Sequence, residues 1–439
     1  MKKTFTLKSF KSKPLNGLIN VPSDKSISIR SLIISSVCIG NTKIFNLLES
    51  DDVINTLKVL RGLDIKIKKK TSYYEVSGQG GFFSDPENSL NFGNSGTAVR
   101  LMTGLLSTSE INATLTGDKS LSSRPMKRVI EPLSKMNVSI SDHDGLLPIR
   151  ISHDNKKHIP IRHTLNIGSA QVKSSILLAA LNVKGTSKII EKIASRDHTE
   201  IMLKYLGAQI KKQKNIISLT SPNFLKPKDL KIPGDFSSAA FIIIAVVLSK
   251  KSKVKIKDVG INFFRTGLLD VLKKMNANIL IKNKRKFNGE SVGDIEIESS
   301  NLTSTIVQKN IVPRLIDEYP ILFVAASFAS GTSKFYGLRE LKIKESNRLK
   351  SMAKALSEGG VKLHLGDDFI EISGKSSQQG GNLVKTESDH RVAMSMLVFG
   401  FFSKKPIVID DMKMIKTSFP GFKELFVNLG AKIEYVQKF

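Results

Sequence analysis

The sequence of 439 residues lacks features that several classes of protein need. Its one cysteine, Cys38, excludes an intrachain disulfide framework and any metal site built from several cysteines. Its longest uninterrupted apolar run, residues 239–248, is about half the length that a bilayer-spanning helix requires. No apolar segment follows the basic start Met1-Lys2-Lys3, as a secretory signal would require. These absences predict a cytoplasmic protein with no membrane association.

Acidic residues are also few, with 39 Asp and Glu against 68 Lys and Arg, a formal net charge of +29. Only 14 of the basic residues are arginines, and the lysines are scattered in short clusters such as 66–70 and 282–286. There is no basic tail and no arginine-rich segment interleaved with aromatic residues. The pattern is typical of a solvated, lysine-rich surface and predicts no nucleic-acid partner. A nucleic-acid-binding or RNA-end-processing protein is an alternative that rests on charge alone.

One sequence pattern occurs six times along the chain: a helical stretch that runs through Gly or Asn into a short alternating strand. The Gly or Asn residues are separated by 69 to 83 positions. A left-handed residue at a helix C-terminus satisfies free carbonyl groups, and Gly and Asn adopt this conformation most easily. The pattern predicts helix ends at Gly62, Asn137, Gly207, Asn276, Gly359 and Gly430.

Between these positions, a polar turn that opens a strongly apolar helix also occurs six times. Each turn carries Ser, Asn or Asp, the residues preferred as helix N-caps, and the helices are apolar enough to be buried on most faces. Short strand-like segments alternate with the helices, so the predicted class is α/β or α+β. Six units of about 70 residues suggest two pseudo-symmetric domains of three units each.

Arginines and one lysine accompany several of these turns. If the buried helices run parallel, their N-termini gather on one face, where free N–H groups and partial positive charge favour anions. Lys25, Arg30, Arg100, Arg124, Arg348 and Arg391 would add full charges to that face. We therefore predict a site for a compact polyanion that carries phosphate and carboxylate groups.

The residues around these turns resemble the enolpyruvyl transferases, and within them the branch that uses shikimate 3-phosphate as acceptor. Eight motifs occur in the order expected of that branch, which makes the resemblance specific over nearly the whole chain. They are Lys25-Ser26 with Arg30, Asn94-Ser95-Gly96-Thr97, Gly117-Asp118 with Arg124, Ser169-Ala170-Gln171, Ser195-Arg196-Asp197-His198-Thr199, Asp317-Glu318-Tyr319-Pro320, Lys344-Glu345-Ser346-Asn347-Arg348 and Asp389-His390-Arg391.

The resemblance implies a fold, an inside-out α/β barrel of two domains that each contain three βαβαββ repeats. One domain would comprise residues 22–233, the other residues 1–21 with 234–439, and the active site would lie in the cleft between them. The implied reaction transfers the enolpyruvyl group of phosphoenolpyruvate to the 5-hydroxyl of shikimate 3-phosphate and releases phosphate. The resemblance implies no metal and no organic cofactor, a monomer, and inhibition by glyphosate at the phosphoenolpyruvate site.

The resemblance also implies roles for individual residues, in three groups. Asp317 and Glu345 would be the catalytic acid/base pair, with Lys25 between the two ligands. Shikimate 3-phosphate would contact Lys25, Ser26, Arg30, Ser169, Ala170, Gln171, Ser195, Arg196, Asp317 and Lys344. Phosphoenolpyruvate would contact Lys25, Asn94, Gly96, Arg124, Gln171, Arg348, Arg391 and Lys416. His390 is either the N-cap of its helix or a catalytic group.

Three positions depart from the pattern of the family. Ser23 stands where Gly is usual, Ile29 where a polar residue is common, and Asn347 where Asp is usual. None of these positions is expected to hold a charged group that contacts a ligand. The departures therefore affect only how precisely the ligand-binding groups are positioned. The alternative within the same fold is UDP-N-acetylglucosamine enolpyruvyl transferase, which carries a reactive cysteine in the loop corresponding to residues 117–124. That loop contains no cysteine here.

Overall fold

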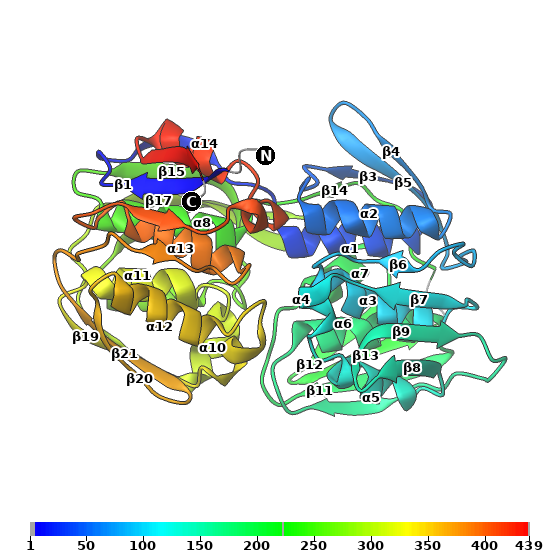
Figure 1. Ribbon diagram of the computed structural model, residues 1–439. Helices are drawn as coiled ribbons and strands as arrows, with labels where there is room; N and C mark the ends of the chain where they lie inside the picture. Colours follow the sequence, from blue (N-terminus) through cyan, green and yellow to red (C-terminus); the bar gives the residue numbers. More distant parts are fainter. Residues whose placement is uncertain (1–4, 222–223, 438–439) are drawn as a thin grey trace. The chain divides into compact units, whose positions relative to one another are not determined.

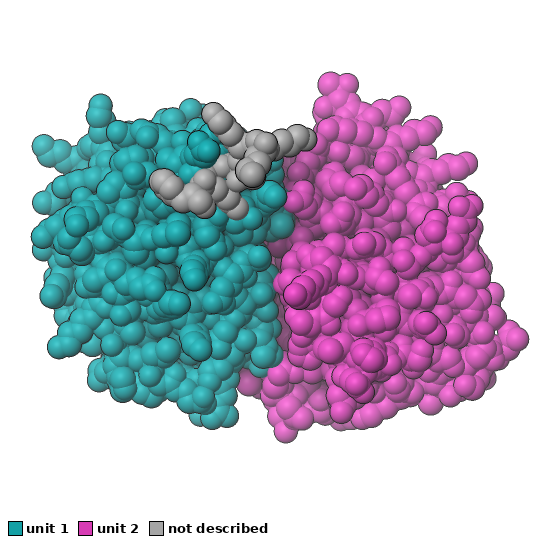
Figure 2. Space-filling view, viewed as in Figure 1, with its two compact units in different colours: residues 1–22, 234–285, 291–439 teal, residues 23–233, 286–290 magenta. Residues whose placement is uncertain are grey.

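The computed structural model describes residues 5–221 and 224–437, which form two compact units. Unit 1 contains the described residues as far as Pro22, then Gly234–Arg285 and the described residues from Ser291 onward. Unit 2 contains Ser23–Pro233 except for the two residues not described, together with Lys286–Glu290. Figure 2 colours the two units separately. Each unit has its own continuous apolar core.

Each unit contains three four-stranded sheets with the same pairing pattern. In every sheet the first two strands are parallel and the third is antiparallel to the second. In unit 2 the sheets are, in spatial order, β14 (Leu230–Lys231), β3 (Ile39–Phe45), β5 (Tyr73–Gln79) and β4 (Lys66–Lys69); β6 (Leu90–Asn91), β7 (Ala113–Thr116), β9 (Leu146–Ser152) and β8 (Ser139–His143); and β10 (Arg162–Leu165), β11 (Gly185–Glu191), β13 (Ile216–Ser221) and β12 (Gln209–Gln213).

Unit 1 repeats this arrangement with strands from both ends of the chain. Its sheets are β2 (Asn16–Asn20), β15 (Lys253–Gly260), β17 (Glu290–Glu298) and β16 (Asn278–Phe287); β18 (Ile306–Val307), β19 (Gly331–Tyr336), β21 (Phe369–Gly374) and β20 (Lys362–Leu365); and β22 (Leu383–Val384), β23 (Ile407–Ile409), β1 (Phe5–Phe10) and β24 (Lys432–Gln437). Strand β1 pairs with β24 from Phe5↔Gln437 to Phe10↔Lys432. The N-terminal strands therefore complete two sheets that the C-terminal half leaves one strand short.

Three helices form the core of each unit (Figure 1). They are α1 (Lys25–Ser36), α3 (Gly96–Ser107) and α6 (Ala170–Ala179) in unit 2, and α8 (Phe236–Leu248), α11 (Tyr319–Phe328) and α13 (His390–Phe399) in unit 1. Helix α8 buries every residue except its last, Leu248, because its sequence is apolar on all faces. The core helices of a unit pack on one another, α3 on α1 and α6, and α11 on α8 and α13.

The core helices begin at the predicted polar turns. Side chains cap five of the six, and the acceptors belong to Asp24, Ser95, Ser169, Asp235 and Asp389. Helix α11 differs, because its N-cap is Glu318 and no side chain accepts a bond there. The carboxylate of the preceding residue, Asp317, instead faces arginines, as described below.

A second set of helices, the outer helices, is buried on one side only. They are α2 (Asp51–Gly62), α5 (Lys127–Ser134), α7 (His198–Tyr205), α9 (Gly267–Lys274), α12 (Arg348–Glu358) and α14 (Phe422–Leu429). The remaining helical segments are short: α4 (Lys119–Ser122), α10 (Val312–Leu315), η1 (Ala180–Asn182), η2 (Lys309–Ile311), η3 (Arg339–Ile343) and η4 (Lys413–Thr417).

Four outer helices end in a left-handed residue at the predicted position, namely Asn137, Gly207, Asn276 and Gly430. The other two helices also end at the predicted positions, since α2 ends at Gly62 and Gly359 is the C-cap of α12. Their left-handed residues, however, lie further along the chain, at Asp64 and Gly360. The C-cap residue of α2, Leu63, is fully buried and lies between Gly62 and the left-handed Asp64.

The predicted α/β class and the six-repeat architecture are confirmed by these six sheets. No helix in residues 5–221 or 224–437 is long and apolar enough to cross a membrane.

Candidate functional site

In unit 2, the N-terminus of α1 carries the first group of candidate residues. Asp24 caps the helix by accepting a bond from the Ile27 amide at 2.8 Å. The next residue, Lys25, is mostly buried, and its Nζ donates to Asp52 Oδ2 at 2.9 Å. Asp52 lies in the first turn of α2, so these two helix N-termini meet through an ion pair. Asp52 was not predicted as part of the site.

One turn further along α1, Arg30 is almost completely buried and surrounded by oxygen atoms. Its guanidinium donates to Thr199 Oγ1 at 2.9 Å, to Ser174 Oγ at 3.2 Å and to the Ser26 carbonyl at 3.0 Å. Burial lowers the pKa of Arg30 to about 10, and the charge of Arg196 acts in the same direction. The carboxylates of Asp24, Glu200 and Glu290 act in the opposite direction, so this buried guanidinium has both a second cation and several carboxylates near it.

The predicted turn of residues 195–199 joins β11 to α7. Ser195 is buried, and its hydroxyl donates to Glu191 Oε1 at 2.5 Å. Arg196 is half-buried, and Thr199 Oγ1 lies 2.6 Å from Ser174 Oγ. The structure therefore brings Arg30, Arg196 and Ser174 together at the start of α7, and it turns the Ser195 hydroxyl inward.

The start of α3 carries a second arginine pair. Arg124 donates to Asn94 Oδ1 and to Ser120 Oγ, the latter at 3.2 Å, while Asn94 donates to Asp118 at 2.9 Å. Arg100 donates to Gln171 Oε1 at 3.0 Å and to the Gly96 carbonyl at 3.2 Å. A Cβ atom added to Gly96 would lie 2.8 Å from Arg100 Nη1 and 3.1 Å from Arg124 Nη1. Gly96 therefore makes room for two guanidinium groups.

In unit 1, Arg348 is the centre of a carboxylate cluster. It begins α12, is only 1% exposed, and bonds through Nε to Asp389 Oδ2 at 2.7 Å. Its other nitrogens contact Glu345 and, at 3.4 Å, Asp317 Oδ1. Burial opposes its charge, but the three carboxylates outweigh burial and raise the pKa of Arg348. The predicted acid/base pair, Asp317 and Glu345, thus shares one guanidinium.

Asp389 fixes a second arginine of this cluster. Its Oδ1 accepts the backbone N–H of Arg391 at 2.9 Å and caps α13, while Oδ2 holds Arg348. Arg391 in turn donates through Nη1 to the Asp317 carbonyl at 2.8 Å. Asp389 is fully buried, and it is the N-cap residue in place of His390, which is the first residue of the helix.

Two further groups of unit 1 were not predicted. Arg265 lies 3.6 Å from Asp317 Oδ2 and donates to Asp235 at 2.9 Å and to Ser237. Glu318 accepts a bond from Ser237. Arg265 could have been found from the repeat, because arginine stands just before or at the start of four outer helices: Arg124 before α5, Arg196 before α7, Arg265 before α9 and Arg348 in α12.

The two predicted lysines of unit 1 differ in their surroundings. Lys344 is partly buried next to Glu345, and burial lowers its pKa, against the effect of Asp317. Lys416 is exposed on η4, which packs against α13. Within the described residues, no group of three or more His, Cys, Asp or Glu side chains is arranged to hold a metal ion.

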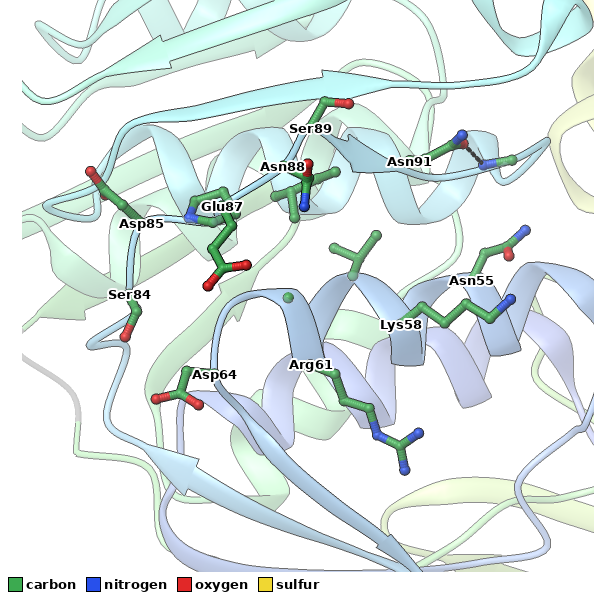
Figure 3. A pocket seen from close by; sticks show the side chains of 15 residues that line it. Asn55, Lys58, Arg61, Asp64, Ser84, Asp85, Glu87, Asn88, Ser89 and Asn91 are labelled. Carbon is green, nitrogen blue, oxygen red and sulfur yellow. Dashed lines mark hydrogen bonds between the residues drawn. The ribbon is translucent and has the colours of Figure 1, made fainter.

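A groove of about 720 Å³ lies elsewhere in unit 2, between α2 and the segment that leads into β6. Figure 3 shows Lys58 and Arg61 on the helix side and Asp85 and Glu87 on the other side. All four side chains are exposed. The groove reaches Gly93, the residue before Asn94, but contains none of the predicted ligand-binding residues.

The two clusters have complementary chemistry. The cluster in unit 2 is rich in cations, hydroxyls and amides, which suits phosphate and carboxylate groups, and its carboxylates Asp52, Asp118 and Glu191 each accept a bond from one of these groups. The cluster in unit 1 combines three arginines with carboxylates that could accept or donate a proton.

Comparison with known proteins gives a consistent result. The model of the family "EPSP synthase (3-phosphoshikimate 1-carboxyvinyltransferase)" matches residues 10–426. The 3-phosphoshikimate 1-carboxyvinyltransferase of Bartonella quintana (strain Toulouse) is 45% identical over 442 residues, which cover 99% of this chain and 100% of the relative. The EPSP synthase structure from Acinetobacter baumannii has a TM-score of 0.88 at 36% identity and covers 99% of this chain and 100% of that one. The enolpyruvyl transferase NikO from Streptomyces tendae, at 15% identity and a TM-score of 0.80 over 99% of both chains, shares the fold.

Proposed function

The chain belongs to the EPSP synthase (3-phosphoshikimate 1-carboxyvinyltransferase) family, and from this premise we propose that the polar clusters of its two units together form one active site. The protein transfers the enolpyruvyl group of phosphoenolpyruvate to shikimate 3-phosphate. The family resemblance inferred from the motifs is thereby confirmed, and the two alternative functions considered from the sequence are set aside. We propose that the enzyme is a monomer and that the acceptor is the 5-hydroxyl group.

We assign shikimate 3-phosphate chiefly to unit 2. Its phosphate and carboxylate would be bound by Arg30, Arg196 and the start of α6, where Ser169 caps the helix and leaves amide groups for an anion. The burial of Arg30 supports this assignment, because burial disfavours its charge and a bound anion would stabilise that charge. Lys25, Ser26, Ala170 and Gln171 would complete the contacts, with Asp317 and Lys344 supplied by unit 1.

We assign phosphoenolpyruvate to the arginines of both clusters. Arg124 of unit 2 and Arg348 and Arg391 of unit 1 would bind its phosphate and carboxylate, and Gly96 would allow a close approach of the backbone. Asn94 holds Arg124 in place, as Asp389 holds Arg348 and Arg391. Lys25, Gln171 and Lys416 complete this proposed set.

The reaction requires proton transfers at two atoms, carbon 3 of phosphoenolpyruvate and the acceptor oxygen, as well as binding. Carbon 3 of phosphoenolpyruvate gains a proton while the acceptor oxygen loses its own and bonds to carbon 2. The tetrahedral intermediate then loses a proton from the new methyl group and expels phosphate, which restores the double bond. We propose that Glu345 serves the carbon and Asp317 the acceptor hydroxyl, with Lys25 near both ligands. The observation that carries this proposal is Arg348, which contacts both carboxylates and so holds them near one substrate.

The test replaces each carboxylate with its amide. Asp317→Asn and Glu345→Gln should lower kcat about 10²- to 10⁴-fold, the usual contribution of general acid/base catalysis, with smaller effects on KM. Arg124→Ala should mainly raise the KM for phosphoenolpyruvate. The control is Glu358→Gln at the exposed end of α12, which should leave both constants unchanged. The assay is phosphate release that depends on shikimate 3-phosphate, and near-normal turnover of Asp317→Asn would refute the assignment.

A further inference from the structure

Lys173 is a fully buried lysine at the end of the first turn of α6, two residues after Gln171. Its Nζ lies 3.0 Å from Glu191 Oε1 and 2.7 Å from Glu200 Oε1, and it donates to the Ser195 carbonyl at 3.2 Å. The side chains of both glutamates are less than a tenth exposed. Buried lysines are rare unless they are paired, and here one ammonium group meets three oxygen atoms.

The oxygen partners of Lys173 all lie around the turn of residues 195–199. Glu191 is the last residue of β11, and Glu200 lies in the first turn of α7. Glu191 Oε1 also accepts the N–H of Ser195 at 3.1 Å and its hydroxyl at 2.5 Å. Lys173 and Glu191 together therefore hold the N–H, the hydroxyl and the carbonyl of Ser195.

The same segment of α6 holds the other end of the turn. Ser174, the neighbour of Lys173, lies 2.6 Å from Thr199 Oγ1, which also accepts a bond from Arg30 Nε at 2.9 Å. Arg196 lies between the two fixed ends of the turn and is close enough to Arg30 for its charge to lower the pKa of Arg30. The residues on both sides of Arg196, Ser195 and Thr199, are therefore held by side chains of α1, α6 and β11.

Stability alone does not explain this buried ionic cluster. Well-packed apolar residues in place of a buried ion group are often equally stabilising or more so, because charges lose their hydration on burial. The geometry at Ser195, by contrast, cannot be reproduced by apolar side chains, which offer no bond to its backbone. The cluster therefore has a role in fixing the conformation of the turn of residues 195–199.

We propose that Lys173, together with Glu191, is a positioning group that holds the turn of residues 195–199 in the conformation that binds shikimate 3-phosphate. This inference rests on the proposed function, in which Arg196 and Arg30 bind the substrate. Lys173 itself touches no substrate, because it is fully enclosed.

The test compares Lys173→Met, which keeps an unbranched chain of similar length but removes the charge, with Glu200→Gln. Lys173→Met should raise the Kd and KM for shikimate 3-phosphate about 10- to 100-fold, because small displacements of binding groups have large effects. The KM for phosphoenolpyruvate should change little. Glu200→Gln keeps both groups that hold Ser195 and should stay within about threefold of the parent. Calorimetric titration with shikimate 3-phosphate alone supplies the Kd without any catalysis.

Lys173→Met could fail to fold, because it leaves two buried carboxylates without their cation. In that case Glu191→Gln provides the test, because it keeps the size of the side chain but weakens its hydrogen bonds with Ser195. It should raise the Kd for shikimate 3-phosphate. Its melting temperature should equal that of Glu200→Gln. An unchanged Kd in a folded Lys173→Met or Glu191→Gln variant would overturn the proposal, as would equal increases in both KM values. If the parent enzyme released no phosphate from phosphoenolpyruvate in the presence of shikimate 3-phosphate, that result would instead refute the proposed function.

Discussion

Gly96 shows how a single missing side chain shapes the proposed phosphoenolpyruvate site. Because glycine has no Cβ, a ligand can approach the backbone closely at this position. The structure adds a different neighbour, since an added methyl group would meet the ends of Arg100 and Arg124 before any backbone atom outside the helix. Both are flexible side chains that can shift, so substitution is expected to displace charge and leave the fold intact.

We therefore predict that Gly96→Ala raises the KM for phosphoenolpyruvate a few-fold and the inhibition constant of glyphosate by about tenfold or more. The longer inhibitor tolerates a displaced Arg124 and a new methyl group less well than the shorter substrate does, and such a clash confers specificity. Steady-state kinetics with and without glyphosate measures both constants. An unchanged melting temperature excludes a folding defect, and a folded variant with the inhibition constant of the parent would contradict the prediction.

Asp294 on β17 provides a pH-dependent contribution to stability. Burial opposes its charge, but hydrogen bonds from Asn283 and Arg285 outweigh burial and lower its pKa to about 2. The unfolded value is about 3.9, so the folded state binds fewer protons between these two pH values. The stabilisation is complete above about pH 4 and disappears as the pH falls through about 2.

Asp294→Asn should therefore cost about 2 kcal/mol of unfolding free energy at pH 6 and less at pH 3. Thermal unfolding at the two pH values measures the difference. The matched control is Asp270→Asn, because Asp270 pairs with Arg314 at 2.7 Å but is 52% exposed, and exposed pairs contribute little. Equal losses for Asp294→Asn at both pH values would count against the assignment.

At the scale of elements, the helix-to-strand turns depend on backbone conformation more than on contacts. Gly207 follows α7 with φ of +97°, and an added Cβ would have no neighbour within 4 Å. Gly62 is the last residue of α2 and has ordinary φ, although the sequence pattern gives both glycines the same role.

Gly207→Ala should therefore destabilise the protein by about 1 kcal/mol, because an L-residue is strained in the left-handed region, and Gly207→Asn should cost less. Gly62→Ala should be neutral or stabilising by up to about 1 kcal/mol, because alanine is the better helix former. Urea unfolding of the three variants provides the comparison. A loss for Gly62→Ala equal to that for Gly207→Ala would contradict the observed helix end.

For the whole molecule, the main consequence of the proposal is that charged groups of both units must act on the same ligands. In this proposal, unit 2 contributes Arg30, Arg124 and Arg196, and unit 1 contributes Arg348 and Arg391. Cations on separate bodies repel one another until an anion lies between them, and ligand binding can then shift the molecule toward a closed state.

We predict that saturating shikimate 3-phosphate decreases the radius of gyration measured by small-angle X-ray scattering. Shikimate, which lacks the phosphate, is the matched ligand and should have a smaller effect at equal concentration, because it carries fewer negative charges. An unchanged radius at saturation with shikimate 3-phosphate would be inconsistent with closure.

The sequence by itself determined the family, the reaction, the α/β class and most turns that open the core helices. These follow from local rules, since capping, helix C-termini and apolar periodicity act over a few residues, and the motifs lie within single turns. Only the tertiary structure decided which distant groups meet. The ion pair of Lys25 with Asp52, the double role of Asp389, the approach of Arg265 to Asp317 and the enclosure of Lys173 join residues from different elements. No local pattern encodes such pairings, because they depend on how the elements of each unit pack around a common core.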